Sequence, residues 1–313
     1  MNTNVDYQSR KTIVKYAIIA LSVLIVLCAV ILAVWNIYNA VSGGSDSGLP
    51  EAKLKDGVAT KEDSLYGSLI LINNSHEYTF PEGEGSALIK ISTFMGYQNE
   101  ANYAYVDNSF QLNKDAMPHI HEMLNQMYND LDNQFIISSA YRTYAYQDQL
   151  TTSSTKAGFS DHHSGYTFSL KRGNETPLAA EDIEWVQKNA HKYGIIMRYP
   201  EDKSSITEVS DYENCFRYVG VPHATYISQN KDENGNSDYL CLEEYIEFLK
   251  ANANITNDQN PLKIKCGEDV YHVYYYEFSG TQIDIKIPED EKAYPYEISG
   301  TNDGGVIVTV KSK

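Results

Sequence analysis

Four short segments carry the side chains from which a functional site could be built. They are residues 139–144 (SAYRTY), 160–165 (SDHHSG), 189–200 (NAHKYGIIMRYP) and 216–220 (FRYVG). Their histidine, aspartate, arginine and serine residues are types that bind metal ions or anions. The common zinc signatures H-E-x-x-H and C-x-x-C are absent, and so are the Walker sequence, G-x-G-x-x-G and G-x-S-x-G. The sequence therefore gives no support to a nucleotide-binding enzyme or a serine hydrolase.

Hydrophobic periodicity predicts the elements that must position these segments. Apolar residues at three- and four-residue intervals from Met117 to Met127 predict a helix over residues 115–131. A second helix is predicted over residues 181–193, with Gly194 at its C-cap. The other predicted elements are strands at 68–72, 135–138, 195–198 and 216–220, a helix start at 144–150 and a helix at 240–251.

The pattern changes after a polar break at residues 252–261. Four β-rich runs follow, separated by turn residues, at 270–278, 282–287, 294–298 and 306–311. We therefore predict a separate, small all-β module over residues 262–313.

The four segments, in this order, resemble the VanY-type D-alanyl-D-alanine carboxypeptidases, which are zinc enzymes of the LAS type that trim peptidoglycan stem peptides. The family pattern is approximately S-G-Y-R-S-Y, S-E-H-Q-T-G-x-x-x-D, N-A-x-K-Y-G-F-I-L-R-Y-P and Y-E-P-W-H-x-R-Y-V-G. The resemblance extends from about residue 65 to residue 248. It implies an α+β, LAS/VanY-like metallopeptidase-type domain, and it suggests a bacterial, wall-facing protein.

The resemblance also indicates which residues stand at the zinc positions. The family holds zinc with a His and an Asp seven residues apart and a later His, and leaves the fourth position to a water whose pKa zinc lowers to about 7. The first ligand matches His162. Ser169 stands at the Asp position, Cys215 at the later His and Tyr212 at the catalytic Glu. The resemblance therefore implies a vestigial metal site without its general base.

Two alternatives would keep a metal site. A shifted alignment places Glu213 at the general-base position, and the Cys215 thiolate could bind zinc beside His162, with Asp161 or His163 nearby. His162 and His163 are adjacent, and adjacent residues of a strand point to opposite faces, so both can hardly converge on one ion.

The family's substrate contacts are better matched than its zinc ligands. By resemblance, Arg142 would take the terminal carboxylate of D-Ala-D-Ala in a charge-assisted pair, with Gln147 and Ser160 as polar contacts. A structural ion pair is an equally good interpretation of Arg142.

An uncharged run of twenty residues, 16–35, is long enough to cross a bilayer as a helix. Arg10, Lys11 and Lys15 precede it, so we predict a cytoplasmic N-terminus and an uncleaved signal anchor rather than a cleaved signal peptide. The predicted organisation is a cytoplasmic tail (1–15), a transmembrane anchor (16–35), a stalk (36–62), a VanY-like domain (63–252) and the β module (262–313).

The resemblance, together with the predicted membrane anchor, implies a cell-surface pseudo-peptidase. The formal charge is −17, from 42 acidic and 25 basic residues, and this excludes nucleic acid as a partner. The predicted ligand is a peptidoglycan stem peptide or a cell-wall protein, with no cofactor. One alternative is an active zinc D,D- or L,D-carboxypeptidase that uses His162, Cys215 and Glu213. Another is a structural or adhesion ectodomain in which the β module binds.

Overall fold

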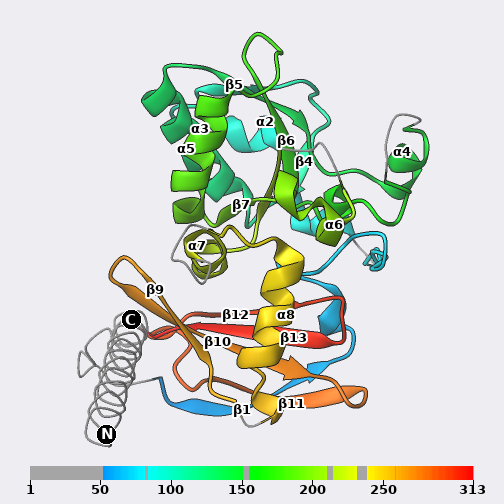
Figure 1. Cartoon of the computed structure of the whole chain (residues 1–313), viewed down its shortest axis with the longest axis vertical. Coiled ribbons are helices and arrows are strands. Elements are labelled where there is room, and N and C mark those ends of the chain that lie inside the picture. The colour runs from blue at the N-terminus through cyan, green and yellow to red at the C-terminus, as the bar shows by residue number, and fades with distance from the viewer. Residues whose placement is uncertain are drawn as a thin grey trace, which may run out of the picture. The chain divides into compact units, whose positions relative to one another are not determined.

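The computed structural model describes residues 52–81, 84–150, 155–209, 214–230, 238–257 and 259–312 (Figure 1). The predicted tail and anchor, residues 1–35, lie outside these ranges. Among the helices within them, none is both long enough and apolar enough to cross a membrane.

A five-stranded sheet forms the centre of the predicted VanY-like domain. Only its first pair, β3 and β5, is parallel, and the remaining pairs are antiparallel. In spatial order the strands are β3 (Tyr103–Tyr105), β5 (Phe135–Ser139), β6 (Thr167–Arg172), β8 (Cys215–Tyr218) and β7 (Ile195–Met197).

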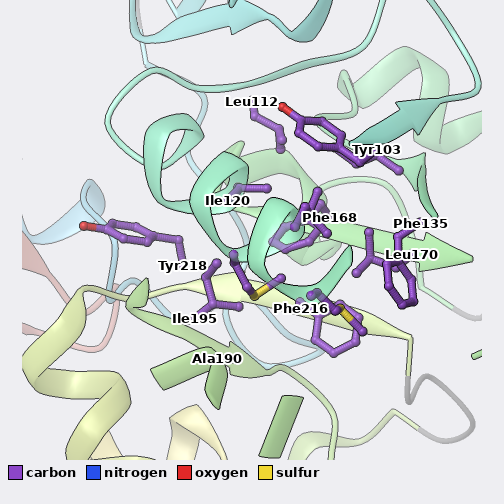
Figure 2. Close-up of a cluster of buried hydrophobic side chains, with 14 of the residues drawn as sticks. Tyr103, Leu112, Ile120, Phe135, Phe168, Leu170, Ala190, Ile195, Phe216 and Tyr218 are labelled. Atoms are coloured by element: carbon purple, nitrogen blue, oxygen red, sulfur yellow. The ribbon is translucent and has the colours of Figure 1, made fainter. Parts of the chain in front are cut away.

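Two helices, α3 (Met117–Leu131) and α5 (Ala180–Asn189), bury their apolar stripes in the core of this sheet. Alternation along β6 sends Phe168 and Leu170 into that core, where Phe216 of β8 meets them (Figure 2). Thr167 and Ser169 therefore lie on the opposite face, and that face carries the candidate site. Both helices begin within two residues of the predicted positions, but α5 ends at Asn189, and Gly194, with φ of 73°, ends the following single turn η4 (Ala190–Tyr193) instead.

A second antiparallel sheet follows near the C-terminus and contains three of the four predicted strands, while the fourth, at 282–287, is present in a separate two-stranded sheet. The strand order of the second sheet is β12 (Tyr296–Gly300), β13 (Gly305–Lys311), β10 (Asp269–Glu277) and β9 (Leu262–Cys266), while β11 (Gln282–Pro288) pairs with β1 (Leu54–Thr60). The predicted stalk is therefore wrong for residues 54–60. Its charged residues Lys55 and Asp56 are both exposed, Lys286 pairs with Asp56, and the backbone of the strand pairs with β11.

The two predicted domains share a hydrophobic core. Helices α7 (Val221–Gln229) and α8 (Leu242–Asn252) pack with Ile196 of the first sheet and with Val273 and Ile307 of the second. In Figure 1, α8 (yellow) lies along β10 and β13. Residues 52–313 accordingly form one compact unit, and the predicted boundary at residues 252–262 does not divide its core.

Short elements connect these layers. Residues 68–72 are largely buried but irregular, so the predicted strand there is wrong: the N–H of Leu69 donates to Ser299 Oγ at 2.9 Å, and that of Leu71 to the Thr301 carbonyl at 2.8 Å. The remaining elements are β2 (Leu88–Lys90), β4 (Gln111–Asn113), α2 (Ile91–Met95), α4 (Tyr144–Asp148), α6 (Ser204–Thr207) and single turns η1 (Asp63–Leu65), η2 (Glu84–Ala87), η3 (Asp161–Ser164), η4 (Ala190–Tyr193), η5 (Glu201–Lys203) and η6 (Ile255–Asn257).

Candidate ligand-binding site at the vestigial zinc position

Three small polar residues stand in a row across the open face of the central sheet. Ser169 of β6 pairs with Cys215 of β8 on one side and with Ser139 of β5 on the other. A β-bulge between Ile137 and Ser139 inserts one residue into β5. The bulge turns Ser139 away from the core, where strict alternation would have placed it.

His162 approaches this row from the turn η3. Its Nδ1–H donates to the Ala140 carbonyl at 2.9 Å, so Nε2 carries the lone pair, and Nε2 lies 3.5 Å from Ser169 Oγ. Burial, followed by the nearby positive charge of Arg142, lowers the pKa of His162 to about 3. The imidazole is therefore neutral at physiological pH and presents Nε2 to the polar row.

Cys215 completes the row as a protonated thiol. It is a buried free cysteine, and burial, followed by the charge of Asp161, raises its pKa to about 12. Ser169 hydrogen-bonds to this thiol as well. The structure thus brings together the three residues that the family resemblance assigns to zinc-ligand positions.

These three side chains do not fit a catalytic zinc site. Such a site needs three protein ligands from Cys thiolate, His nitrogen and Asp or Glu oxygen, plus an open position for water. Here a neutral serine hydroxyl replaces the carboxylate, so that only His162 and Cys215 remain of the three ligand types that such a site needs. In the described ranges, no three His, Cys, Asp or Glu side chains form a group that could hold a metal ion.

Asp161 does not supply the missing carboxylate. It is wholly buried and forms an ion pair with Arg217, while Arg198 Nε lies 3.2 Å from its Oδ1. Arg198 also makes a two-pronged pair with Glu243, at 2.8 and 3.0 Å. Burial alone would raise the pKa of Asp161, but the two guanidinium groups outweigh it and lower the pKa. Asp161 is committed to this ionic cluster.

His163 is also committed elsewhere. Its Nδ1–H donates to the Arg142 carbonyl at 2.7 Å, and its Nε2 accepts from the N–H of Gly158 at 3.0 Å. The prediction that His162 and His163 cannot share one ion is therefore confirmed, although the reason is a turn rather than strand alternation.

Arg142 stands next to the polar row. Its Nε and Nη2 donate to Ser139 Oγ at 3.1 and 2.7 Å, and its Nη1 donates to Gln147 Oε1 at 3.0 Å. Gln147, from α4, is itself fixed by a bond of 2.8 Å from its Nε2 to the Thr155 carbonyl. The positive charge of Arg142 acts to lower the pKa of both His162 and Cys215, although burial raises the pKa of Cys215 overall. The guanidinium therefore lies near the row.

The described residues include most, but not all, of the predicted site residues. Ser160 is buried and directly precedes η3. Tyr212 and Glu213 lie outside the described residues, so both general-base assignments remain predictions. Ser139 was missed as a site residue, although it opens the segment SAYRTY; its orientation depends on the bulge in β5.

Comparisons with known proteins agree with this arrangement. The profile of the VanY family of D-alanyl-D-alanine carboxypeptidases matches residues 109–221. A D-alanyl-D-alanine carboxypeptidase from Enterococcus faecium is 30% identical over 256 residues, which cover 80% of this chain and 77% of that protein. The chain belongs to the VanY family.

Two further likenesses are partial. A D-alanyl-D-alanine carboxypeptidase from Enterococcus faecalis is 30% identical over 137 residues, covering 37% of this chain and 48% of that protein. The crystal structure of the vancomycin resistance D,D-dipeptidase VanXYg, with a D-Ala-D-Ala phosphinate analogue, matches 83% of this chain and 99% of its own at a TM-score of 0.65 and 23% identity. This last likeness shows a shared fold, and it confirms the predicted α+β, VanY-like architecture.

Proposed function

We propose that this VanY-family protein binds D-alanine-terminated stem peptides of peptidoglycan without hydrolysing them. Family membership supports the class of ligand, and the position of Arg142 supports recognition of a terminal carboxylate. A guanidinium is planar and binds a carboxylate through two parallel hydrogen bonds, which gives both affinity and orientation.

The observation that carries the proposal is the hydroxyl of Ser169 within 3.5 Å of His162 Nε2. At this place the family has a carboxylate, whose negative charge offsets that of the metal ion. A neutral hydroxyl offers no such charge, and water activation by zinc needs three firm protein ligands. Peptide capture at Arg142 does not depend on that ligand, so binding can persist where hydrolysis is lost.

Titration calorimetry of the full-length protein in detergent with an acylated D-Ala-D-Ala peptide tests the proposal. We expect saturable binding, with no release of D-alanine over hours in the presence of added zinc. Peptide ending in an amide instead of a carboxylate serves as the matched control and should not bind. Release of D-alanine, or equal binding of the amide, would contradict the proposal.

A second candidate is an active zinc D,D- or L,D-carboxypeptidase. It is favoured by Cys215, because thiolate is a good zinc ligand and this thiol shares its neighbour Ser169 with His162. Glu213 would then act as general base. Zinc-dependent release of D-alanine that is abolished by both Cys215→Ser and Glu213→Gln would favour this candidate over binding alone.

We also propose that residues 16–35 anchor the protein in the cell membrane, with residues 36–313 outside. The uncharged run and the basic residues before it support this orientation. In intact cells, added protease should digest an epitope tag at the C-terminus and spare one at the N-terminus. The reverse pattern would contradict the orientation.

A further inference from the structure

A second pocket lies beside the Arg142 site, and no step described above uses it. It has a volume of about 240 Å³ and opens between the irregular residues 66–81, η2, β4 and η3. Five aromatic rings and one buried amide are part of its lining. The rings are those of Tyr66, Tyr78, Tyr141, Tyr166 and His163, and the amide is that of Asn113.

The lining is neutral. None of the described residues that line the pocket is an Asp, Glu, Lys or Arg. The pKa of the Tyr166 hydroxyl is raised. Burial is the largest cause, and the nearby carboxylates of Glu297 and Asp115 add to it. The phenol therefore keeps its proton, and the described lining offers an anionic ligand no positively charged partner.

The aromatic lining continues towards the Arg142 site. The rings of Tyr78 and His163 are stacked, with centroids 6.2 Å apart and an interplanar angle of 16°. Phe80 contacts His163 edge-on at 4.9 Å and Tyr144 of α4 at 6.2 Å. Since His163 also holds the Arg142 carbonyl, the pocket and the peptide site share one side chain.

We propose that this pocket binds one neutral pyranose ring, of the N-acetylated amino-sugar class. Tyrosine offers an apolar ring face with a polar hydroxyl at its edge, and a sugar ring has matching C–H faces and hydroxyls. The volume lies below the usual range of about 300–1,000 Å³ for drug-sized ligands, so it suits a single ring rather than an extended chain. The pocket itself supports a neutral ring, and the choice of an N-acetylated amino sugar rests on the proposed function, because a peptidoglycan strand would be its source.

Saturation-transfer NMR tests the pocket with N-acetylglucosamine as the probe and the full-length protein in a sugar-free detergent. We expect transfer to the ring and acetyl protons, with glucuronate giving a weaker signal. Ala87→Phe places a ring in the pocket from η2 and removes no polar group. Ser86→Trp places a larger ring in the pocket from its rim. Each should weaken sugar binding at least about tenfold, which corresponds to 1.4 kcal/mol. Ala251→Phe, an equal change at an exposed position on α8, should leave it unchanged.

The outcomes separate this inference from the proposed function. No transfer in the wild-type protein, equal transfer in both filled variants, or stronger binding of glucuronate would overturn it. Sugar binding without binding of the D-Ala-D-Ala peptide would contradict the proposed function and leave this inference standing. Retained peptide affinity and thermal midpoint in the filled variants would show that lost sugar binding does not come from unfolding.

Discussion

Asp161 and His162 are neighbours in the chain but belong to clusters of opposite character. Asp161 lies in a buried ionic cluster, with Arg217, Arg198 and Glu243 paired so that each charge meets an opposite one. His162 faces a neutral cluster formed by Ser169 and Cys215. Buried charges persist only where they are paired, because burial without a partner is costly.

The difference shows which part of the family's architecture the fold itself needs. The ionic cluster connects η3, β7, β8 and α8, and Arg217 also donates to the Ser68 carbonyl at 2.9 Å. Among the described residues, the neutral cluster connects η3 with β6 and β8 through uncharged contacts. Replacing a metal-binding carboxylate by serine would therefore leave the scaffold intact, and under the proposed function it removes the chemistry.

The largest expected effect is the restoration of zinc binding by Ser169→Asp, Cys215→His and Tyr212→Glu together. These substitutions would rebuild the family's ligands and its general base on an unchanged scaffold. Zinc affinity, measured by competition with a chromogenic chelator, should rise by at least about three orders of magnitude. The same triple variant with Asn at position 169 is the matched neutral control. Equal affinity of the two would mean that Ser169 is not the missing ligand position.

In the ionic cluster, Asp161→Asn should destabilise the fold. It leaves Arg217 and Arg198 buried with one negative partner fewer, and breaking a buried pair costs about 3–5 kcal/mol. Denaturant unfolding measures this cost. The same change at the exposed Asp107 should cost less than about 1 kcal/mol. Similar losses in both variants would refute the distinction between the clusters.

At the border of the two clusters, Arg142→Lys should weaken binding of the D-Ala-D-Ala peptide. Lysine keeps the charge but loses the planar fork, and a hydrogen bond to a charged group contributes about 1.5–3 kcal/mol. The expected loss is about tenfold to a hundredfold by calorimetry. Arg172→Lys, in the ion pairs with the exposed Glu181 and the buried Asp182, is the matched control. Unchanged affinity in Arg142→Lys would exclude Arg142 as the carboxylate-binding residue.

The last prediction concerns His223, a buried neutral histidine outside both clusters. Its ring nitrogens lie 2.7 Å from Tyr245 Oη and 2.9 Å from Thr309 Oγ1, and burial lowers its pKa to about 3. The unfolded chain takes up this proton near pH 6.5, and the folded chain does so only near pH 3. The contribution of His223 to the free energy of unfolding is therefore fully present above about pH 6.5. It falls by about 1.4 kcal/mol per pH unit as the pH is lowered from there towards pH 3.

Unfolding free energies measured from pH 7 to pH 4 test this expectation. His223→Gln should reduce the slope, while Thr309→Val should lower stability equally at each pH, because it removes a partner but no titrating group. An unchanged slope in His223→Gln would contradict a buried, neutral His223.

Sequence periodicity predicted the elements whose burial has a regular pattern. Helix α3 has an unbroken apolar stripe, and the C-terminal strands alternate clearly. Strand β1 was missed because its charged residues resemble a linker until β11 is known to pair with it. The proximity of His162 and Ser169 was predicted from the seven-residue spacing of the family's zinc ligands, not from hydrophobic periodicity or turn chemistry. The orientation of Ser139 depends on one inserted residue in β5, which no pattern in the sequence marks.

The zinc content of the full-length protein, purified without chelator and measured by elemental analysis, tests the central claim most directly. The neutral cluster of His162, Ser169 and Cys215 predicts far less than one zinc per chain, even after dialysis against micromolar zinc. About one tightly held zinc per chain, lost in Cys215→Ser, would contradict this account and support the active carboxypeptidase.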